Sequence, residues 1–143
     1  MSETLEAQAA QMEYPPTKGG LVTYLNVDGA IAAAEFYVKA FDAEIAAIMP
    51  PDDQGRTMHA HVYVNGSSLM ISDFYPEHGH EKVAAQGFTL VIMTTDIDRQ
   101  YAHAVANGAT GVMPPQDMFW GDRYAELKDP YGVSWAMNQP IKA

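Results

Sequence analysis

A pattern that occurs twice, about 67 residues apart, constrains the fold of this chain more than any other feature of its sequence. Each copy has a short apolar strand, an acidic residue, a helix rich in small residues and a hairpin-like pair of strands. The copies begin at residues 21–28 and 88–96. Two copies are too few for a solenoid, which needs at least three repeats. The repeat therefore predicts two βαβββ half-units, with the functional space in a cleft between them.

Local signals place the elements of each half-unit. The predicted strands are 21–27, 44–49, 59–64 and 68–73 in the first half, and 88–94, 111–114, 124–128 and 133–138 in the second, with helices at about 28–41 and 96–107. Asn65-Gly66 is typical of a two-residue type I′ hairpin turn. That turn sets Val62 opposite Leu69, so the apolar side chains share one face. The other face is either solvated or lines a cleft, and it carries His59, His61, Tyr63, Ser68, Met70 and Ser72.

Composition excludes several classes of partner and chemistry. With 143 residues, of which 48% are hydrophobic, the chain suits one domain. A net charge of −10 disfavours nucleic acid and anionic membranes, because both need basic patches. The absence of cysteine excludes disulfides, thiolate nucleophiles and cysteine-bound zinc. Residues 1–11 lack the features of a secretory signal, and no run approaches the roughly 18 apolar residues of a membrane span. We expect a cytoplasmic protein with no nucleic-acid or membrane partner.

Three sets of residues resemble the vicinal oxygen chelate superfamily, which includes glyoxalase I, bleomycin-resistance proteins and extradiol dioxygenases. They are Val27-Asp28 before Phe36-Tyr37, Asp96 before Asn107-Gly108-Ala109, and the turn Asp129-Pro130-Tyr131-Gly132. The stretch 113–124, which contains Phe119-Trp120-Gly121-Asp122-Arg123, looks like the PhnB-like branch of that superfamily.

This resemblance covers about residues 20–139 and implies an α+β fold in a single domain. Paired βαβββ modules, at about 20–75 and 87–139, would form a curved eight-stranded mixed sheet around a cleft, usually within a homodimer. Residues 1–19 would be an N-terminal extension, in which residues 2–12 could form a short helix.

The family's metal site does not carry over to this sequence. Metal-dependent members place ligands on the first, fourth, fifth and eighth strands, which correspond here to Val22, Met70 or Ser72, Thr89, and Ala136. None is a histidine or a glutamate, the donors that such metals need. No glycine motif for S-adenosylmethionine is present either. We therefore predict no metal and no cofactor, and expect no tightly bound transition metal.

His59 and His61 are the candidate catalytic residues, since their spacing on a strand points both side chains to one face. They could act as acid and base, bind a metal with a third ligand, or form an ordinary hydrogen-bonded pair. Tyr63, Met70 and Ser72 share that face and are candidate ligand-binding residues. His78 and His80, in the loop between the halves, could chelate a metal adventitiously.

Trp120 and Arg123 are the remaining candidates for ligand binding. A loop that carries Phe119, Trp120 and Gly121 can close over a ligand, with Arg123 as a clamp for a carboxylate or phosphonate. We expect this lid at the cleft mouth, within reach of His59 and His61. The alternative is structural, with Arg123 in an ion pair and the aromatic rings at a sheet edge or interface.

These observations favour a glyoxalase- or bleomycin-resistance-like protein whose metal-free cleft binds a small molecule, with an anionic ligand as one option. The alternatives are a metal-independent lyase, isomerase or transferase that uses His59 and His61 as acid and base, and a metal-dependent enzyme with a site outside the family pattern.

Overall fold

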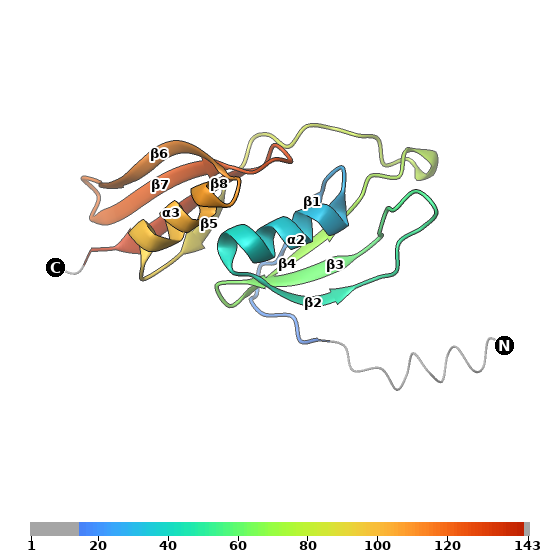
Figure 1. The fold of residues 1–143 in the computed structure, drawn as a ribbon, viewed down its shortest axis with the longest axis horizontal. Helices are drawn as coiled ribbons and strands as arrows, with labels where there is room; N and C mark the ends of the chain where they lie inside the picture. Colours follow the sequence, from blue (N-terminus) through green and yellow to red (C-terminus); the bar gives the residue numbers. More distant parts are fainter. Residues whose placement is uncertain (1–14, 142–143) are drawn as a thin grey trace.

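Two βαβββ modules follow each other along the chain in the computed structural model, which describes residues 15–141 (Figure 1). The first contains β1 (Thr23–Asn26), α2 (Ala30–Phe41), β2 (Glu44–Ile48), β3 (Ala60–Val64) and β4 (Ser67–Ser72). The second contains β5 (Leu90–Met93), α3 (Ile97–Ala106), β6 (Thr110–Asp117), β7 (Asp122–Lys128) and β8 (Ser134–Pro140). The short 3-10 helix η1 (Pro76–His78) lies in the connection. The predicted α+β class and paired modules are confirmed, whereas the helix expected at 2–12 lies outside the described residues.

Each module forms a mixed four-stranded sheet, so the eight strands of one chain make two separate sheets. The strand orders are β1-β4-β3-β2 and β5-β8-β7-β6. In the first sheet β1 runs parallel to β4, and in the second β5 runs parallel to β8; the other neighbouring strands are antiparallel. The registers correspond: Tyr24 lies opposite Met70 in the first sheet, as Val91 lies opposite Ala136 in the second.

Each helix packs on one face of its own sheet and begins at a cap from the last strand. Alanine-rich α2 buries Ala30, Ala33, Ala34, Tyr37, Ala40 and Phe41. Its first two amides, of Gly29 and Ala30, donate to the buried Asp73 carboxylate at 2.7 and 3.2 Å. In module 2, Ile97 N of α3 donates to Gln139 Oε1 at 2.8 Å. Both caps come from the residue directly after the last position at which β4 pairs with β1 or β8 pairs with β5, so the repeat extends to the helix starts.

Most strand boundaries differ from the prediction by one or two residues, and the end of β6 differs by more. The sequence predicts a strand at 111–114 and a loop over 115–121, but β6 continues to Asp117 and the loop is shorter. Prolines 114 and 115 are tolerated because β6 is an edge strand with register shifts on both sides of Met113. Edge strands and bulges accept residues that lack an amide hydrogen.

The modules of one chain meet through their helix sides. The ring centre of Trp135, on β8, lies 4.7 Å from the ring centre of Phe41 and 5.2 Å from that of Tyr37, both on α2. Helices α2 and α3 also contact each other (Figure 1). The face of each sheet that carries no helix, here called its open face, therefore points away from the contact. Within one chain the two open faces do not enclose a common space.

No helix within residues 15–141 is both long enough and apolar enough to cross a membrane.

Candidate functional site

The open face of module 1, here called the histidine face, carries Tyr24, His59, His61, Tyr63, Met70 and Ser72. Alternation along β3 and β4 produces it, because Ala60, Val62, Leu69 and Ile71 point to the core on the other side. The five candidates on the predicted hairpin therefore share one face. Tyr24, on β1, joins them through the pairing of β1 with β4.

The two imidazoles differ in their surroundings. Their ring centres are 6.4 Å apart. His59 is half-buried, and its Nδ1 lies 3.4 Å from the hydroxyl of Tyr24, which also donates to Met58 O at 3.1 Å. His61 is buried, with Nε2 2.7 Å from Ser68 Oγ. Burial lowers the pKa of His61, and the neighbouring His59 lowers that pKa further. His61 is therefore neutral near pH 7.

The other residues of the histidine face are engaged to different degrees. Tyr63 packs edge-on against His61, with ring centres 5.0 Å apart, and its hydroxyl donates to Pro16 O at 2.7 Å. Ser72 is buried, and its Oγ accepts from Asn26 Nδ2 at 2.7 Å and donates to Asp73 O at 3.1 Å. Met70 lies half-buried between them. Of the candidates from the hairpin, His59 and Met70 are the most available to a ligand.

The loop that leads into β3 holds His59 in place. The amide of Thr57 donates to Asp73 Oδ2 at 2.8 Å, and its hydroxyl donates to Met49 O at 2.8 Å. Further out, Arg56 donates two hydrogen bonds to Glu77 at 2.6 and 3.1 Å. This guanidinium lowers the pKa of Glu77 to about 2. Asp73 thus links the start of α2 to the segment that carries His59.

The open face of module 2, here called the glutamate face, carries Val91, Met93, Met113, Trp120, Tyr124 and Glu126. The Tyr124 hydroxyl donates to Glu126 Oε2 at 3.1 Å, and the Trp120 ring lies edge-on to Tyr124 at 5.8 Å. Burial and the Glu126 carboxylate raise the pKa of Tyr124. Val91 and Met93 are 50% and 56% exposed. Glu126 holds the register position opposite Ala136 that His61 holds opposite Met70.

Tyr124 and Glu126 are not among the site residues expected from the sequence. The signal was the alternation along residues 122–128, in which Ala125 and Leu127 are buried. That alternation assigns Tyr124 and Glu126 to the open face, just as it assigns Arg123 to the helix side.

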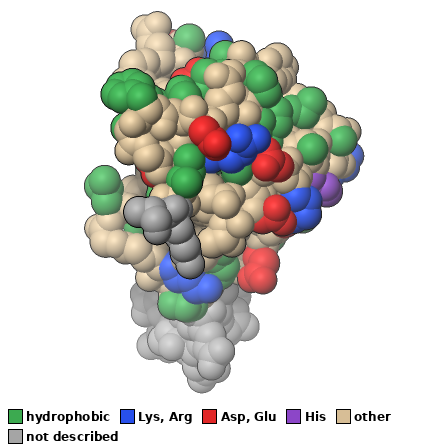
Figure 2. Space-filling view, turned by 90° about the vertical axis from the view of Figure 1, so that its left-hand side faces the viewer, with side chains coloured by type: hydrophobic (Ala, Val, Ile, Leu, Met, Phe, Trp, Pro, Cys, Tyr) green, Lys and Arg blue, Asp and Glu red, His purple; other side chains and the backbone are tan. Residues whose placement is uncertain are grey.

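Arg123 is oriented away from the glutamate face. Its Nη2 lies 2.8 Å from Asp98 Oδ1, on α3, and its Nη1 lies 3.0 Å from Asp117 Oδ1, on β6. These two carboxylates raise the pKa of the guanidinium. On the side of the molecule formed by module 2, basic side chains lie next to acidic ones (Figure 2). The structure therefore brings Trp120, but not Arg123, together with Tyr124 and Glu126. Among the two alternatives for Arg123, the contacts favour the structural one.

We expect the Arg123→Ala substitution to have a small effect on stability and none on ligand affinity. The ion pairs are partly exposed, and such pairs contribute about 0.2–1 kcal/mol each. A double-mutant cycle with Asp98→Ala, followed by thermal unfolding, would measure the pair. A loss of affinity for an anionic ligand by about 1.5–3 kcal/mol would instead support the clamp predicted from the sequence.

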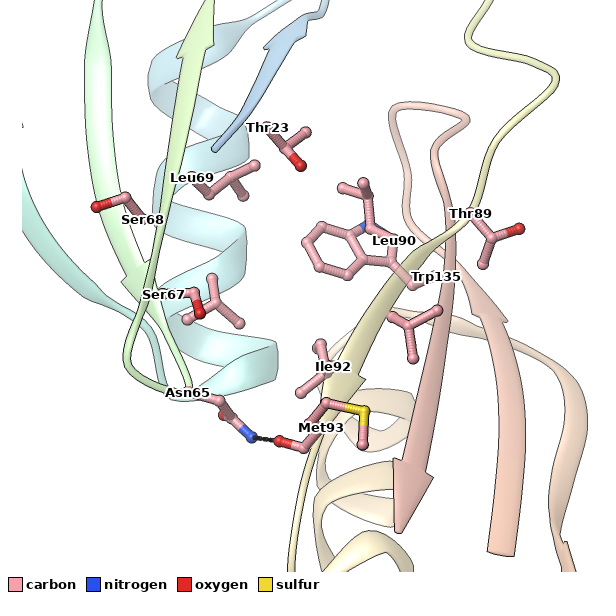
Figure 3. A pocket seen from close by; sticks show the side chains of 12 residues that line it. Thr23, Asn65, Ser67, Ser68, Leu69, Thr89, Leu90, Ile92, Met93 and Trp135 are labelled. Atoms are coloured by element: carbon pink, nitrogen blue, oxygen red, sulfur yellow. Dashed lines mark hydrogen bonds between the residues drawn. The ribbon is translucent and has the colours of Figure 1, made fainter. Parts of the chain in front are cut away.

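A pocket of about 290 Å³ lies at the seam between the modules, and no histidine lines it (Figure 3). Leu69 from module 1 and Leu90, Ile92 and Trp135 from module 2 line its apolar part. Asn65 Nδ2 closes one end by donating to Met93 O at 2.9 Å. Most of these side chains belong to the helix sides of the two sheets, as expected if the helix sides meet there.

The residues at the family's metal positions do not fit a metal. Val22, Met70 or Ser72, Thr89, and Ala136 offer neither an imidazole nor a carboxylate. Within residues 15–141, histidine, aspartate and glutamate side chains form no group of three that could hold an ion. This region includes His59, His61, His78 and His80. No step that uses a metal follows from this arrangement.

The modular fold and the two open faces define a protein of the glyoxalase type. The chain matches the Glyoxalase/Bleomycin resistance protein/Dioxygenase superfamily over residues 20–137 and belongs to that superfamily. An uncharacterized protein of Mycobacterium bovis is 36% identical over 129 residues, which cover 85% of this chain and 84% of the relative.

Two solved structures illustrate the likeness in fold. TioX from Micromonospora sp. ML1 has a TM-score of 0.69 at 23% identity, over 86% of this chain and 99% of its own. A PhnB protein from Bacillus cereus has a TM-score of 0.60 at 29% identity, over 85% of this chain and 99% of its own. The PhnB-like resemblance of the sequence thus has a structural counterpart.

Proposed function

We propose that this protein is a homodimeric small-molecule-binding member of the superfamily. The ligand space would lie between the histidine face of one copy and the glutamate face of a second copy. A twofold dimer of this kind contains two identical clefts, each built from both chains. No metal takes part in this proposal.

One observation carries the proposal: each module presents an open face that is only half complete as a binding site. Each face combines polar groups with uncovered apolar side chains, and one chain turns the two faces away from each other. Met58 beside the histidine face and Val91 and Met93 on the glutamate face are about half exposed. Exposed apolar surface of this kind, rimmed by polar groups, is typical of interfaces and ligand sites. A second copy supplies the missing wall.

The chemistry of the two walls indicates the kind of ligand. The histidine face offers imidazoles and the Tyr24 hydroxyl, and the opposite wall offers the Glu126 carboxylate with Trp120 beside it. The carboxylate disfavours an anionic ligand, and Arg123, the expected anchor for an anion, is paired elsewhere. We therefore propose a small, partly aromatic molecule that donates hydrogen bonds, such as a heteroaromatic amine or alcohol.

A metal-independent reaction is a second candidate. The observation that favours it is the pairing of titratable groups on both faces: His59 with Tyr24 on one, and Tyr124 with Glu126 on the other. Such pairs can move a proton to or from a bound molecule. Of the two histidines expected to act as acid and base, His59 is the one that exchanges the proton in this proposal, because Nε2 of His61 is held by Ser68. A bound ligand that is chemically converted over time would distinguish catalysis from sequestration.

A thermal-shift screen of aromatic amines, alcohols, carboxylates and phosphonates tests the proposal. A ligand that binds the native state raises the melting temperature by mass action, because it adds about 2.7 kcal/mol to the free energy of unfolding at 100 times its Kd. For a compound found in this way, His59→Ala and Glu126→Gln should each weaken binding about tenfold or more. The first removes a hydrogen bond to the ligand, and the second removes the charge that strengthens one.

His78→Ala is the matched control, since His78 is exposed in the connection and lies on neither face. It should leave the affinity unchanged. Binding that is indifferent to both His59→Ala and Glu126→Gln would contradict the proposed site.

A further inference from the structure

Residues 15–18, here called the strap, cross one end of the histidine face although they precede the region that matches the family. Lys18 exchanges two hydrogen bonds with Ser68: its amide donates to Ser68 Oγ at 2.7 Å, and its carbonyl accepts from Ser68 N at 3.0 Å. Pro16 O accepts from the Tyr63 hydroxyl at 2.7 Å, and Lys18 Nζ lies 4.0 Å from the centre of the Tyr63 ring. The strap therefore contacts Tyr63 and Ser68, both of which contact the His61 ring.

The hydrogen bonds of Ser68 determine what its hydroxyl can do. A serine hydroxyl has one proton to donate and two lone pairs. One lone pair accepts from the Lys18 amide, and among the described residues the remaining partner of Oγ is His61 Nε2, at 2.7 Å. Ser68 is buried. Its proton is satisfied only if Ser68 donates it to His61, which requires Nε2 to be the acceptor nitrogen of a neutral ring.

We propose that the strap is a positioning element of the histidine face, which acts through Ser68 to hold His61 in the tautomer with its proton on Nδ1. In this tautomer His61 acts as a hydrogen-bond donor through Nδ1. Its Nε2 is occupied by Ser68 and is unable to take a proton from a ligand while the strap is docked. This inference goes beyond the proposed function, since it concerns the state of His61 with or without a ligand.

Ser68 itself is unsuited to act as a nucleophile. Its Oγ lies within hydrogen-bonding distance of an imidazole, as in a catalytic serine–histidine pair, but it already accepts from the Lys18 amide and is only 6% exposed. Its second lone pair is free, but the burial of the side chain leaves little room for a substrate to approach that lone pair. Ser68 therefore transmits the position of the strap to His61.

Several titratable groups lie around His61. They are Lys18 on the strap, His59 and Tyr63 on the same strand, Tyr24 on β1, and Glu44 on β2, which lies opposite Tyr63. A hydrogen bond from Ser68 to the neutral ring favours the uncharged form, in the same direction as burial. Removal of that bond should therefore raise the pKa of His61.

The test uses nitrogen-15 NMR of the histidine rings, with His61 assigned by a His61→Gln variant. In the full chain, His61 Nε2 should show the shift of an unprotonated acceptor nitrogen and Nδ1 that of a protonated one. Lys18→Pro removes the amide hydrogen that holds Ser68 together with the charged lysine side chain, and Ser68→Ala removes the hydroxyl. Both should produce a mixture of tautomers and an upward shift in the pH at which His61 titrates.

Lys18→Met is the matched control, because it removes the charge but keeps the amide hydrogen, and it should preserve the tautomer. A full chain with the proton of His61 on Nε2 would overturn the inference. An unchanged tautomer of His61 in Lys18→Pro would also overturn the inference. If Ser68→Ala fails to fold, the result for Lys18→Pro alone tests the inference. The measurement needs no ligand, so failure of the ligand screen would leave this result intact.

Discussion

Replacement of Asp129 by alanine should lower the free energy of unfolding by about 3–5 kcal/mol. The buried carboxylate accepts four hydrogen bonds: from Tyr37 Oη at 2.6 Å, and from Trp135 Nε1, Tyr131 N and Val133 N, each at 2.9 Å. Alanine would leave buried donors without an acceptor, and each such donor costs about 1–3 kcal/mol. Since a domain is stable by about 5–15 kcal/mol in total, the loss would be a large share.

Urea unfolding followed by circular dichroism would measure this effect. Tyr37→Phe is the graded comparison, because it removes one donor and leaves the carboxylate with its other three partners, at a cost of about 1–2 kcal/mol. Asp53→Ala, in the exposed loop between β2 and β3, should change stability by less than about 0.5 kcal/mol. A loss below about 1 kcal/mol for Asp129→Ala would show that the carboxylate does not join the modules.

Introduction of a glutamate at Val91 should convert the proposed dimer to a monomer. Val91 lies on the glutamate face beside Ala136, at the centre of the surface that a second copy would cover. A buried charge without a partner costs about 3–5 kcal/mol, and a twofold interface contains the substitution twice. The dissociation constant should therefore rise by more than about 100-fold.

Sedimentation equilibrium at micromolar concentration would measure the association, and circular dichroism would check that the fold is retained. Val83→Glu is the matched control, because Val83 is 70% exposed in the connection between the modules and lies on neither open face. It should leave the dimer intact. A wild-type protein that is monomeric at this concentration would contradict the dimer while leaving the fold of each chain unaffected.

Arg123 shows where reasoning from the sequence reached its limit at the candidate site. A rare cation beside two aromatic rings was consistent with a clamp for an anion. Alternation along β7 assigns Arg123 to the helix side, but its partners there are two carboxylates, Asp98 on α3 and Asp117 on β6, which only the fold brings together. No spacing along the chain indicates that Asp98, 25 residues away, is a partner.

Asp129 illustrates the same limit in the core. The sequence predicts its turn with Pro130 and Gly132, and that turn is present, with Gly132 N donating to Asp129 O. Its second role, as acceptor for the hydroxyl of Tyr37, joins residues 92 positions apart in different modules. A turn depends on near neighbours and can therefore be predicted from the sequence. The contact between the modules joins distant residues and cannot be predicted in this way.

The sequence by itself determined the two βαβββ modules, the hairpin at Asn65-Gly66 and the shared face of His59 and His61. These features follow from the period of two along a strand and from turn preferences, both of which act between near neighbours. Only the tertiary structure decided that the modules meet through their helix sides, that Arg123 pairs with Asp98 and Asp117, and that residues 15–18 reach Ser68 beside His61. Those outcomes depend on which surfaces bury most apolar area together, and that quantity is a property of the whole folded chain.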